Sequence, residues 1–374
     1  MSLSTRKLLK SHLSFTELTL GGAQIGNHPV AMNKSDAIAL IASAWENGVR
    51  VFDTAPLYGY GLSENIFGEV LKKYPREEFI LSTKVGRLLV PDANPKGSDD
   101  LFPESLPFID VFDYSYDGIM QSVKESLQRL QMTYLDVVHI HDIDVYTHGD
   151  KQPLVMRSFL EKNMAGKSGY DALLELREAK IIRAIGVGSN NWECCLEVIE
   201  KTPEGFIDCV QLANRYTLFE QPSLEKLFPA CIKRNIKVMI AGPLNSGILS
   251  GNSQNRYYNY KLANDEILQK RDRIGAICQK HGITLRDAAL KFLLLNPHVV
   301  TIVSGMRTPD EVKQNVEALK PAHLPALWKE LKELNLMEQE AFTETVMTPK
   351  FLSHKAEKKE HDVKEERPLL KSRL

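Results

Sequence analysis

Four side chains of different chemistry, Asp53, Tyr58, Lys84 and His141, follow one another along the chain in similar local contexts. The carboxylate, the ammonium and the imidazole each end a short apolar run, and the phenol lies in a Gly- and Pro-rich loop after the first run. An ammonium beside a phenol favours the phenolate and lowers the phenol pKa, and a carboxylate keeps the ammonium charged. A histidine can orient a substrate oxygen or relay a proton. These residue types predict proton transfer centred on Tyr58.

The elements that would position these side chains can be counted along the chain. Short β-branched and aromatic runs, typical of buried parallel strands, alternate with segments of helical periodicity. We expect strands at residues 18–23, 49–53, 79–84, 136–142, 183–189, 208–213, 237–243 and 299–305. Eight strand–helix units are the number of a closed barrel, whose active site collects polar groups at the carboxyl ends of its strands. The sequence therefore predicts an α/β fold, a (β/α)8 TIM barrel with long loops on the active face.

Helices are expected wherever apolar residues recur with a spacing near 3.6 residues. Ser63 is the expected N-cap of the second helix, and the last helix would pack outside the barrel. The expected helices cover residues 34–47, 64–73, 116–130, 169–180, 192–200, 223–234, 265–281, 285–295, 308–319 and 324–336.

Three polar segments that follow strand ends are expected to form loops on the active face. Residues 87–113 are interpreted as a substrate-side wall, with a disordered insertion as the alternative. Residues 143–168 form the second loop and residues 250–263 the third. The tyrosines of the third loop are candidate substrate contacts, with core packing or solvation as the alternative for each: Tyr257, Tyr258 and Tyr260.

Size and charge limit the classes of protein to consider. The chain has 374 residues, of which 43% are hydrophobic, and this suits one barrel domain over residues 1–344. The charged residues 345–374 lack a core pattern and are expected to form a disordered tail. With 47 basic and 48 acidic residues, the chain gives no support to nucleic-acid or anionic-membrane binding. No apolar run has the length of a membrane span, and the oligomeric state is left open.

The two ends of the chain and its cysteines indicate where in the cell the protein is expected. Residues 1–14 lack the apolar core of a signal peptide. The five cysteines are an odd number without C-x-x-C spacing, typical of reduced thiols in a cytosolic protein. We therefore expect a cytoplasmic location. The last three residues, Ser372-Arg373-Leu374, are similar to the Ser-Lys-Leu peroxisomal address, which makes a peroxisomal location the alternative to a chance match.

The four polar groups handle a proton but supply no electron carrier. His139 and His141 lie close in sequence, yet no further cluster of zinc spacing accompanies them, so we predict no metal and interpret His139 as a buried barrel histidine. A nicotinamide cofactor would supply or accept the hydride. Residues 186–191 offer only two of the three glycines of the dinucleotide fingerprint, so a Rossmann domain is not predicted.

With these residues in place, residues 18–319 resemble an aldo-keto reductase. The blocks around Asp53 and Tyr58, Ser82-Thr83-Lys84 and Ile140-His141-Asp142 resemble the family's catalytic blocks in the correct order. The resemblance implies a (β/α)8 barrel that binds a nicotinamide dinucleotide without a Rossmann domain. It also implies that Asp53, Tyr58, Lys84 and His141 form the catalytic tetrad, with Tyr58 as the general acid and base.

The resemblance further implies which residues bind the nicotinamide end of the cofactor. Ser189 and Asn190 resemble the pair that holds the carboxamide, and Gln211 matches their partner glutamine. Tyr216 is similar to the tyrosine that stacks on the nicotinamide, although its spacing from Gln211 is longer than usual.

The rest of the cofactor would lie along three strand ends. The small residues Gly22 and Ala23 would let a ligand approach the backbone closely. Residues 242–247 resemble the pyrophosphate loop, with contacts from Gly242, Leu244, Asn245 and Ser246. Residues 305–315 resemble the adenosine clamp, with contacts from Gly305, Met306, Arg307, Gln314 and Asn315.

That clamp departs from the pattern of NADP-preferring members, which carry basic residues for the 2′-phosphate. The corresponding places here are Gly305 and Glu311, which leaves only Arg307 as a cation. A carboxylate at Glu311 should repel the phosphate. The expected cofactor is therefore NAD, with NADP less favoured.

Residues 213–221 and 245–249 are similar to the branch of sugar 1-dehydrogenases, which oxidise D-arabinose, L-galactose or L-fucose to lactones. The implied mechanism has the Tyr58 phenolate taking the C1 hydroxyl proton of a small aldose while C1 passes a hydride to NAD. An NAD(P)H-dependent aldehyde or ketone reductase and a pyridoxal-type dehydrogenase are the enzymatic alternatives. An alternative of another class is a redox-sensing regulatory subunit that keeps the barrel and the cofactor.

Overall fold

The computed structural model describes residues 3–8, 11–92 and 101–342. Eight parallel strands close into a barrel in the order β3-β4-β5-β8-β9-β10-β11-β14, and β14 pairs with β3 to complete the ring. This confirms the predicted (β/α)8 barrel. The predicted tail 345–374, including Ser372-Arg373-Leu374, lies outside the described residues.

The barrel strands begin and end within a few residues of the expected positions. Every residue of the second, third and fourth strands is buried, because helices cover them outside and side chains fill the barrel inside. The strands are β3 (Leu18–Gly21), β4 (Val51–Asp53), β5 (Ile80–Val85), β8 (Leu135–His141), β9 (Ile182–Ser189), β10 (Cys209–Ala213), β11 (Lys237–Ala241) and β14 (Val299–Gly305).

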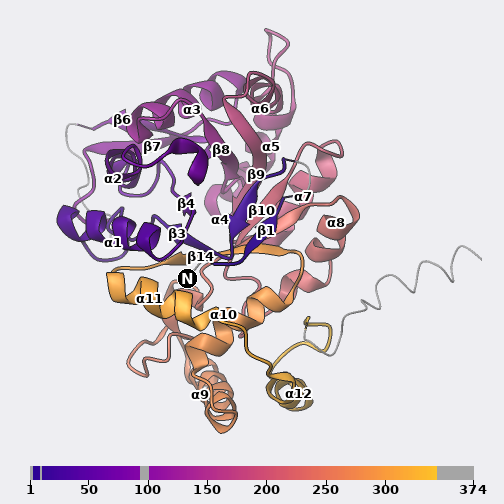
Figure 1. Ribbon diagram of the computed structural model, residues 1–374. Helices are drawn as coiled ribbons and strands as arrows, with labels where there is room; N and C mark the ends of the chain where they lie inside the picture. The colour runs from indigo at the N-terminus through magenta and orange to yellow at the C-terminus, as the bar shows by residue number, and fades with distance from the viewer. Residues whose placement is uncertain (1–2, 9–10, 93–100, 343–374) are drawn as a thin grey trace, which may run out of the picture.

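Helices surround the barrel on its outer face (Figure 1). Those that follow the strands are α1 (Lys34–Glu46), α2 (Leu62–Leu71), α3 (Tyr116–Leu130), α6 (Gly169–Glu178), α7 (Trp192–Lys201), α8 (Leu227–Lys233), α10 (Leu285–Leu295) and α11 (Pro309–Ala318). Further out, α9 (Asp265–Lys280) packs against α12 (Pro325–Glu333), the expected extra helix. Single 3-10 turns are η1 (Arg76–Glu78), η2 (Gly149–Lys151), η3 (Pro222–Leu224) and η4 (Asn245–Gly247).

All three predicted loops contain some regular structure. The described part of the first loop forms an antiparallel hairpin of β6 (Arg87–Pro91) and β7 (Phe108–Phe112). The second contains α4 (Val145–His148) and α5 (Gln152–Leu160). Their sequences are too polar or too short to show a clear period, because tertiary packing rather than propensity decides such elements. In the third loop, β12 (Tyr257–Tyr258) pairs with β13 (Lys261–Leu262).

The predicted N-cap of α2 is wrong. The N-cap is Gly61, whose φ of 96° lies in the left-handed region that glycine adopts readily. Ser63 lies inside the helix, and its hydroxyl donates to the carbonyl of Gly22 at 2.9 Å. The serine therefore fastens α2 to the end of β3 instead of capping the helix.

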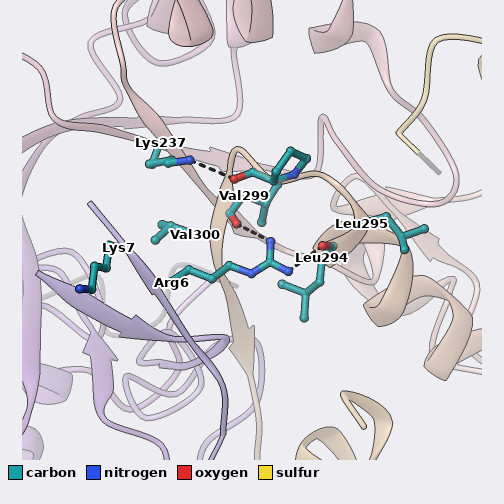
Figure 2. Close-up of a pocket in the computed structure, with 8 residues that line it drawn as sticks. Arg6, Lys7, Lys237, Leu294, Leu295, Val299 and Val300 are labelled. Atoms are coloured by element: carbon teal, nitrogen blue, oxygen red, sulfur yellow. Dashed lines mark hydrogen bonds between the residues drawn. The ribbon is translucent and has the colours of Figure 1, made fainter. Parts of the chain in front are cut away.

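An N-terminal hairpin closes the end of the barrel opposite the strand termini that carry the polar residues. It consists of β1 (Thr5–Lys7) and β2 (Ser14–Thr16). Leu8, Leu13 and Phe15 pack against the first residues of the barrel strands in a separate apolar cluster. The Arg6 guanidinium reaches from β1 to the carbonyls of Leu294 and Val299 at 2.7 and 2.9 Å (Figure 2). It also donates to the Asn296 carbonyl at 3.1 Å.

A buried carboxylate ties three elements together near the same end. Asp136 on β8 accepts hydrogen bonds from Arg76 at 2.7 Å, Arg183 at 2.8 Å and the backbone N–H of Leu81 at 2.9 Å. Its side chain is fully buried. A carboxylate removed from water this completely stabilises the fold only while every partner is in place.

Replacing Asp136 with Ala should therefore lower the free energy of unfolding by ~3 kcal/mol, because the Leu81 N–H and two guanidinium groups lose their acceptor. Urea unfolding followed by circular dichroism measures the change. Glu161→Gln is the matched control, because its 3.8 Å pair with Arg157 is solvent-exposed and should matter by less than ~0.5 kcal/mol. Equal stability of Asp136→Ala and the wild type would contradict this role.

Candidate active site

A carboxylate and an ammonium lie buried side by side at the mouth of the barrel. Asp53 ends β4, and Lys84 on the neighbouring β5 places its Nζ 2.9 Å from Asp53 Oδ2. The ammonium also donates to the Thr54 carbonyl at 2.8 Å, and Ser82 donates its hydroxyl to Asp53 Oδ1 at 2.9 Å. Burial opposes the charged form of Lys84, but Asp53 and Tyr58 together outweigh burial and raise the Lys84 pKa. The lysine is therefore a permanent cation.

Tyr58 lies directly beside this cation. The Lys84 Nζ is 4.8 Å from the centre of the phenol ring, close enough for its charge to act on the phenol. Burial raises the pKa of Tyr58 to about 12, with Asp53 and Asp142 adding to the rise and Lys84 opposing it. The expected lowering by lysine is present, but the net direction expected from the sequence is wrong, because burial outweighs the ammonium.

His141, the last residue of β8, completes the group. Its ring centre is 6.3 Å from that of Tyr58, and the two rings are perpendicular. Burial lowers the His141 pKa well below its ordinary value, and the nearby cations Arg87 and Lys84 lower it further. The imidazole is therefore neutral. Its Nδ1 is buried and makes no hydrogen bond with any of the described residues. The structure thus brings all four predicted residues together.

Aromatic rings form one side of the mouth. The ring of Phe102 lies 6.1 Å from Tyr58, 5.5 Å from His28 and 6.3 Å from Tyr60. Phe102 belongs to the segment that was expected to form a substrate-side wall, and only 3% of it is exposed. The wall next to the phenol is therefore apolar and flat.

Of the three tyrosines in the third loop, one reaches the mouth. Tyr260 lies 6.5 Å from the ring of His28, and the side-chain amides of Asn190 and Asn214 hydrogen-bond to its phenol. Tyr257 and Tyr260 are similarly exposed, at 52% and 50%, so the ring contact with His28 is what places Tyr260 at the mouth. Tyr258 packs on Phe219 at 5.0 Å. Core packing and solvation, the alternatives considered for each tyrosine, thus account for two of them.

The nicotinamide end of the predicted cofactor site offers a buried acceptor. Gln211 on β10 is 4% exposed, and its Oε1 has no partner among the described residues. Its neighbour across the ladder is Gly188, where a Cβ would stand 3.4 Å from that oxygen. A carboxamide N–H would satisfy this acceptor, which fits a nicotinamide. Gly22 and Ala23 follow on from β3 at the same end of the barrel, with Gly22 bonded to the Asp53 carbonyl at 2.7 Å.

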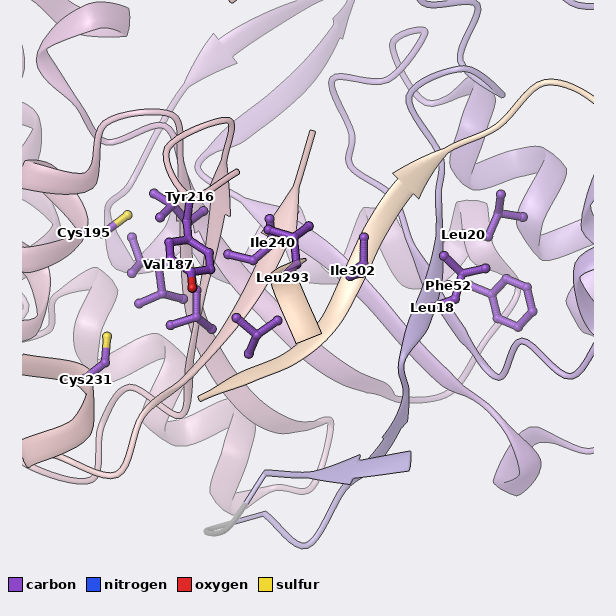
Figure 3. Packing of buried hydrophobic residues seen from close by; sticks show 14 of the residues in the cluster. Leu18, Leu20, Phe52, Val187, Cys195, Tyr216, Cys231, Ile240, Leu293 and Ile302 are labelled. Carbon is purple, nitrogen blue, oxygen red and sulfur yellow. The ribbon is translucent and has the colours of Figure 1, made fainter. Parts of the chain in front are cut away.

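Two predicted contacts at this end are wrong. The Ser189 hydroxyl donates to Asp144 at 2.5 Å and is 4% exposed, because successive residues of a strand point to opposite faces and Gly188 takes the inward place. Tyr216 is fully buried, with its ring 4.7 Å from Phe228 and 5.3 Å from Phe292 (Figure 3). It belongs to the core between barrel and helices and cannot stack on a cofactor.

The predicted pyrophosphate loop turns sharply at the end of β11. Gly242 has a φ of 59°, and a Cβ there would lie 2.1 Å from Asn214 Oδ1, so only glycine fits. Asn245 is fully buried and donates to the Asn214 carbonyl at 3.1 Å, so its side chain builds the loop from inside. Ser246 accepts the Tyr260 N–H at 2.9 Å, and Leu244 begins the turn. Backbone groups of this loop remain the possible contacts to a phosphate.

The predicted adenosine clamp contains a hydrogen bond between a carboxylate and the backbone that its sequence did not reveal. Glu311 on α11 accepts the backbone N–H of Arg307 at 2.7 Å, next to the N-terminus of the helix. The Arg307 guanidinium donates to the carbonyls of Val30 and Ala31, both at 2.9 Å. Arg307, the one cation predicted in the clamp, is thus already hydrogen-bonded within the protein. The Glu311 carboxylate lies at the N-terminus of α11, where a negative charge is favoured.

The other clamp residues differ in what they present. Asn315 is 5% exposed and donates to Ser304 at 3.2 Å, whereas Gln314 accepts from Arg286 at 2.6 Å on the surface. Met306 is buried in the core, so only its backbone can contribute. Gly305 is exposed. A Cβ at this position would collide with the side chain of Gln24, so the glycine leaves room for that side chain.

Sequence reasoning missed three residues near the site. Gln24 lies against the clamp, Asp142 immediately follows His141, and Arg87 donates to Asp142 at 2.9 Å. Strand parity predicts that Asp142 points away from His141, but its φ of 47° turns the backbone. The available signal was the spacing of Arg87 three residues after Lys84, at the start of the wall segment.

Within residues 3–8, 11–92 and 101–342, no three His, Cys, Asp or Glu side chains are grouped to hold a metal ion. In the same part of the chain, no helix is both long and apolar enough to cross a bilayer. The five cysteines are buried free thiols.

Comparisons with known proteins agree with this geometry. The Aldo/keto reductase family matches residues 17–335. The chain is 36% identical to pyridoxal 4-dehydrogenase of Microbacterium luteolum, covering 89% of this chain and 97% of that protein. It is 33% identical to D-threo-aldose 1-dehydrogenase of Pseudomonas sp, covering 87% and 95%.

A solved structure has the same fold. The aldo-keto reductase AKR11C1 from Bacillus halodurans superposes with a TM-score of 0.65 at 22% identity, over 91% of this chain and 99% of that one. Together with the tetrad geometry and the family match, this places the chain among oxidoreductases that use nicotinamide cofactors. The protein belongs to the aldo/keto reductase family.

Proposed function

We propose that the protein is an NAD-dependent dehydrogenase that oxidises C1 of a small aldose, of the D-arabinose, L-galactose or L-fucose type, to its lactone. The observation that carries this proposal is the buried Asp53–Lys84 pair in contact with Tyr58, at a mouth that His141 also faces. The similarity to a protein named D-threo-aldose 1-dehydrogenase supports the substrate class.

Each residue of the tetrad has one task in this reaction. Tyr58, as phenolate, takes the proton of the C1 hydroxyl, and Lys84 stabilises the phenolate through its charge and hydrogen bond. Asp53 holds the lysine in place. The neutral His141 orients the C1 hydroxyl by a hydrogen bond. A bound nicotinamide would accept the hydride that leaves C1.

The proposed cofactor contacts follow the strand ends. Gln211 and Asn190 would hold the carboxamide, and the backbone of residues 242–247 would hold the pyrophosphate. Residues 305–315 would hold the adenosine, with Gln24 as an added neighbour. Glu311 at the N-terminus of α11 favours NAD, because its charge repels a 2′-phosphate.

A second candidate substrate is pyridoxal, favoured by the relative named pyridoxal 4-dehydrogenase. Aldoses and pyridoxal share one chemistry, because each has a hydroxyl that closes on its own aldehyde to give a cyclic hemiacetal. The flat wall at Phe102 suits either a sugar face or a pyridine ring. Comparing NADH formation from a panel of aldoses with that from pyridoxal decides between them.

Two further readings make different predictions in the same assay. An aldehyde or ketone reductase would consume NADH or NADPH with simple carbonyl compounds and produce little NADH from sugars. A redox-sensing regulatory subunit would bind the cofactor and turn over none of these compounds. For location, we propose the cytoplasm, with the peroxisome as the alternative that imaging with and without residues 372–374 would test.

Tyr58→Phe should reduce kcat by roughly 10²- to 10⁴-fold, because the variant keeps the ring but loses the proton acceptor. NAD binding, followed by protein fluorescence, should be unchanged. Tyr146→Phe is the control, since that tyrosine is 69% exposed and has no part in the proposed reaction. Full turnover by Tyr58→Phe would exclude Tyr58 as the base.

The rate of sugar oxidation should rise with pH from neutral to strongly alkaline conditions. The acceptor must be a phenolate, and burial raises the pKa of Tyr58 to about 12, so the active fraction increases about tenfold per pH unit below that value. Because the pKa of His141 is lowered, its titration does not change kcat/KM in this pH range. The measurement is kcat/KM for the sugar against pH. A plateau beginning near neutrality would contradict the assignment.

The wild type should prefer NAD, and Glu311→Ala should raise kcat/KM for NADP by about tenfold, equivalent to ~1.4 kcal/mol of relieved repulsion. Kinetics with both cofactors test this. Glu317→Ala on the same helix is the control, because its exposed carboxylate pairs with Lys320. A wild-type preference for NADP would overturn the cofactor assignment.

A further inference from the structure

A histidine outside the tetrad lies at the mouth of the barrel. His28 belongs to the turn that follows β3, and its N–H donates to the Ala23 carbonyl at 3.1 Å. In the same turn the Gly26 N–H donates to the Gly22 carbonyl at 3.0 Å. Gly26 lies against the backbone of Tyr58, because an added Cβ would stand 2.4 Å from the Tyr58 carbonyl carbon. The turn that carries His28 is therefore packed directly on the loop that carries the catalytic phenol.

The wall segment fixes the side chain of His28. The imidazole Nδ1 hydrogen-bonds to the Leu101 carbonyl at 2.9 Å. Asn27 ties the turn to the same segment, because its side-chain amide donates to the Glu104 carbonyl at 3.2 Å. Asn27 is 3% exposed, and its Oδ1 accepts the Met32 N–H at 2.9 Å. Two contacts between turn and wall thus set the position of the imidazole.

The contact with Leu101 determines which nitrogen of His28 can accept a hydrogen bond. A carbonyl oxygen can only accept, so Nδ1 is the donor and carries the single ring hydrogen of a neutral imidazole. The other nitrogen, Nε2, is then an acceptor. His28 is partly exposed, so a ligand that enters the mouth can reach the ring. The tautomer that the wall selects therefore offers the ligand a nitrogen acceptor.

One aromatic ring separates His28 from the catalytic phenol. The ring centre of Phe102 lies 6.1 Å from that of Tyr58 and 5.5 Å from that of His28. Phe102 is 3% exposed, so it serves as a packed spacer between the two rings. The His28 ring also lies 6.5 Å from the ring of Tyr260, whose N–H donates to Ser246 at 2.9 Å. His28 therefore lies between the wall and a tyrosine that is tied to the predicted pyrophosphate loop.

We propose that His28 is a specificity-determining residue of the active site: its Nε2 accepts a hydrogen bond from a substrate hydroxyl that is remote from the carbon being oxidised. The inference rests on the proposed aldose substrate, whose C1 reacts at Tyr58. The other hydroxyls of an aldose each have a hydrogen to donate. The spacing of one ring between phenol and imidazole matches a single sugar that reacts at one end and is recognised at the other. A simple aldehyde lacks such a donor, so the acceptor selects for a polyhydroxylated substrate.

The test compares an aldose with its monodeoxy analogues, each of which lacks one hydroxyl other than that at C1. In the wild type, kcat/KM should fall about tenfold for the analogue that lacks the recognised hydroxyl, because Nε2 loses its donor. His28→Phe keeps an aromatic ring but has no acceptor, so it should use that analogue and the parent aldose equally well. For the parent aldose, the variant should show a higher KM and a nearly unchanged kcat, as expected for a contact of equal strength in ground and transition states.

His298→Phe is the matched control. His298 directly precedes β14, at the opposite end of the barrel, and its ring lies 6.3 Å from that of Phe342. The same substitution there should leave the discrimination between the analogues unchanged. His28→Gln provides a rescue, because its amide oxygen can take the place of Nε2 and should retain the discrimination. A residue that only packed the loops together would change the stability of the protein but not its choice between an aldose and a deoxy analogue.

Nitrogen NMR examines the histidine without turnover and without a substitution at position 28. In the free wild type, the chemical shifts of His28 should report a hydrogen on Nδ1. With NAD bound to Tyr58→Phe, addition of an aldose should move the Nε2 shift of His28. The shift of His281, which pairs with Glu330 at 2.7 Å, should stay in place. If the wild type oxidises no aldose, the proposed function fails, whereas the Nε2 shift tests His28 separately.

Three results would overturn the proposal. The first is a wild type that uses every deoxy analogue as well as the parent aldose. The second is a folded His28→Phe variant that discriminates between the analogues as the wild type does. The third is an Nε2 shift of His28 that does not move when an aldose is added.

Discussion

The catalytic end of the barrel depends on one ion pair that is almost completely removed from water, Lys84 with Asp53. Taking either charge out of water alone would cost several kcal/mol, so each is tolerable only because the other lies within hydrogen-bond distance. The two residues lie on adjacent strands, and the parallel register of β4 and β5 sets their separation. The barrel is therefore the condition for the ion pair, and the lysine of the pair opposes the rise in the Tyr58 pKa that burial causes.

The same burial has two opposing effects on the phenol. A low local dielectric strengthens the attraction between Lys84 and a phenolate, but it also disfavours the phenolate itself. At Tyr58 the second effect is larger, and two carboxylates add to it. The charges around Tyr58 therefore act against each other, with Lys84 lowering its pKa while Asp53 and Asp142 raise it.

The sequence was most informative where a long apolar run ended in a polar residue. The barrel, its order of elements and the four tetrad residues follow from that pattern together with the family resemblance, because strand ends in a barrel converge by geometry. The direction of side chains was harder to predict from the sequence. Ser189 and Tyr216 were expected at the site, but the Ser189 hydroxyl bonds to Asp144 and Tyr216 packs in the core. Asp142 faces inward only because of a left-handed backbone turn that no residue type required. The β6–β7 hairpin was missed because its order comes from tertiary contacts.

The contacts of Arg6 with the far end of the chain set a constraint on the order in which the molecule can be completed. The guanidinium binds a carbonyl 293 positions later, on the strand that closes the ring. During translation, the first hairpin emerges early, but its contacts with β14 cannot form until that strand leaves the ribosome. Such long-range contacts form late. The ring of this fold therefore closes only late in synthesis, in a step that joins the oldest part of the nascent polypeptide to one made much later.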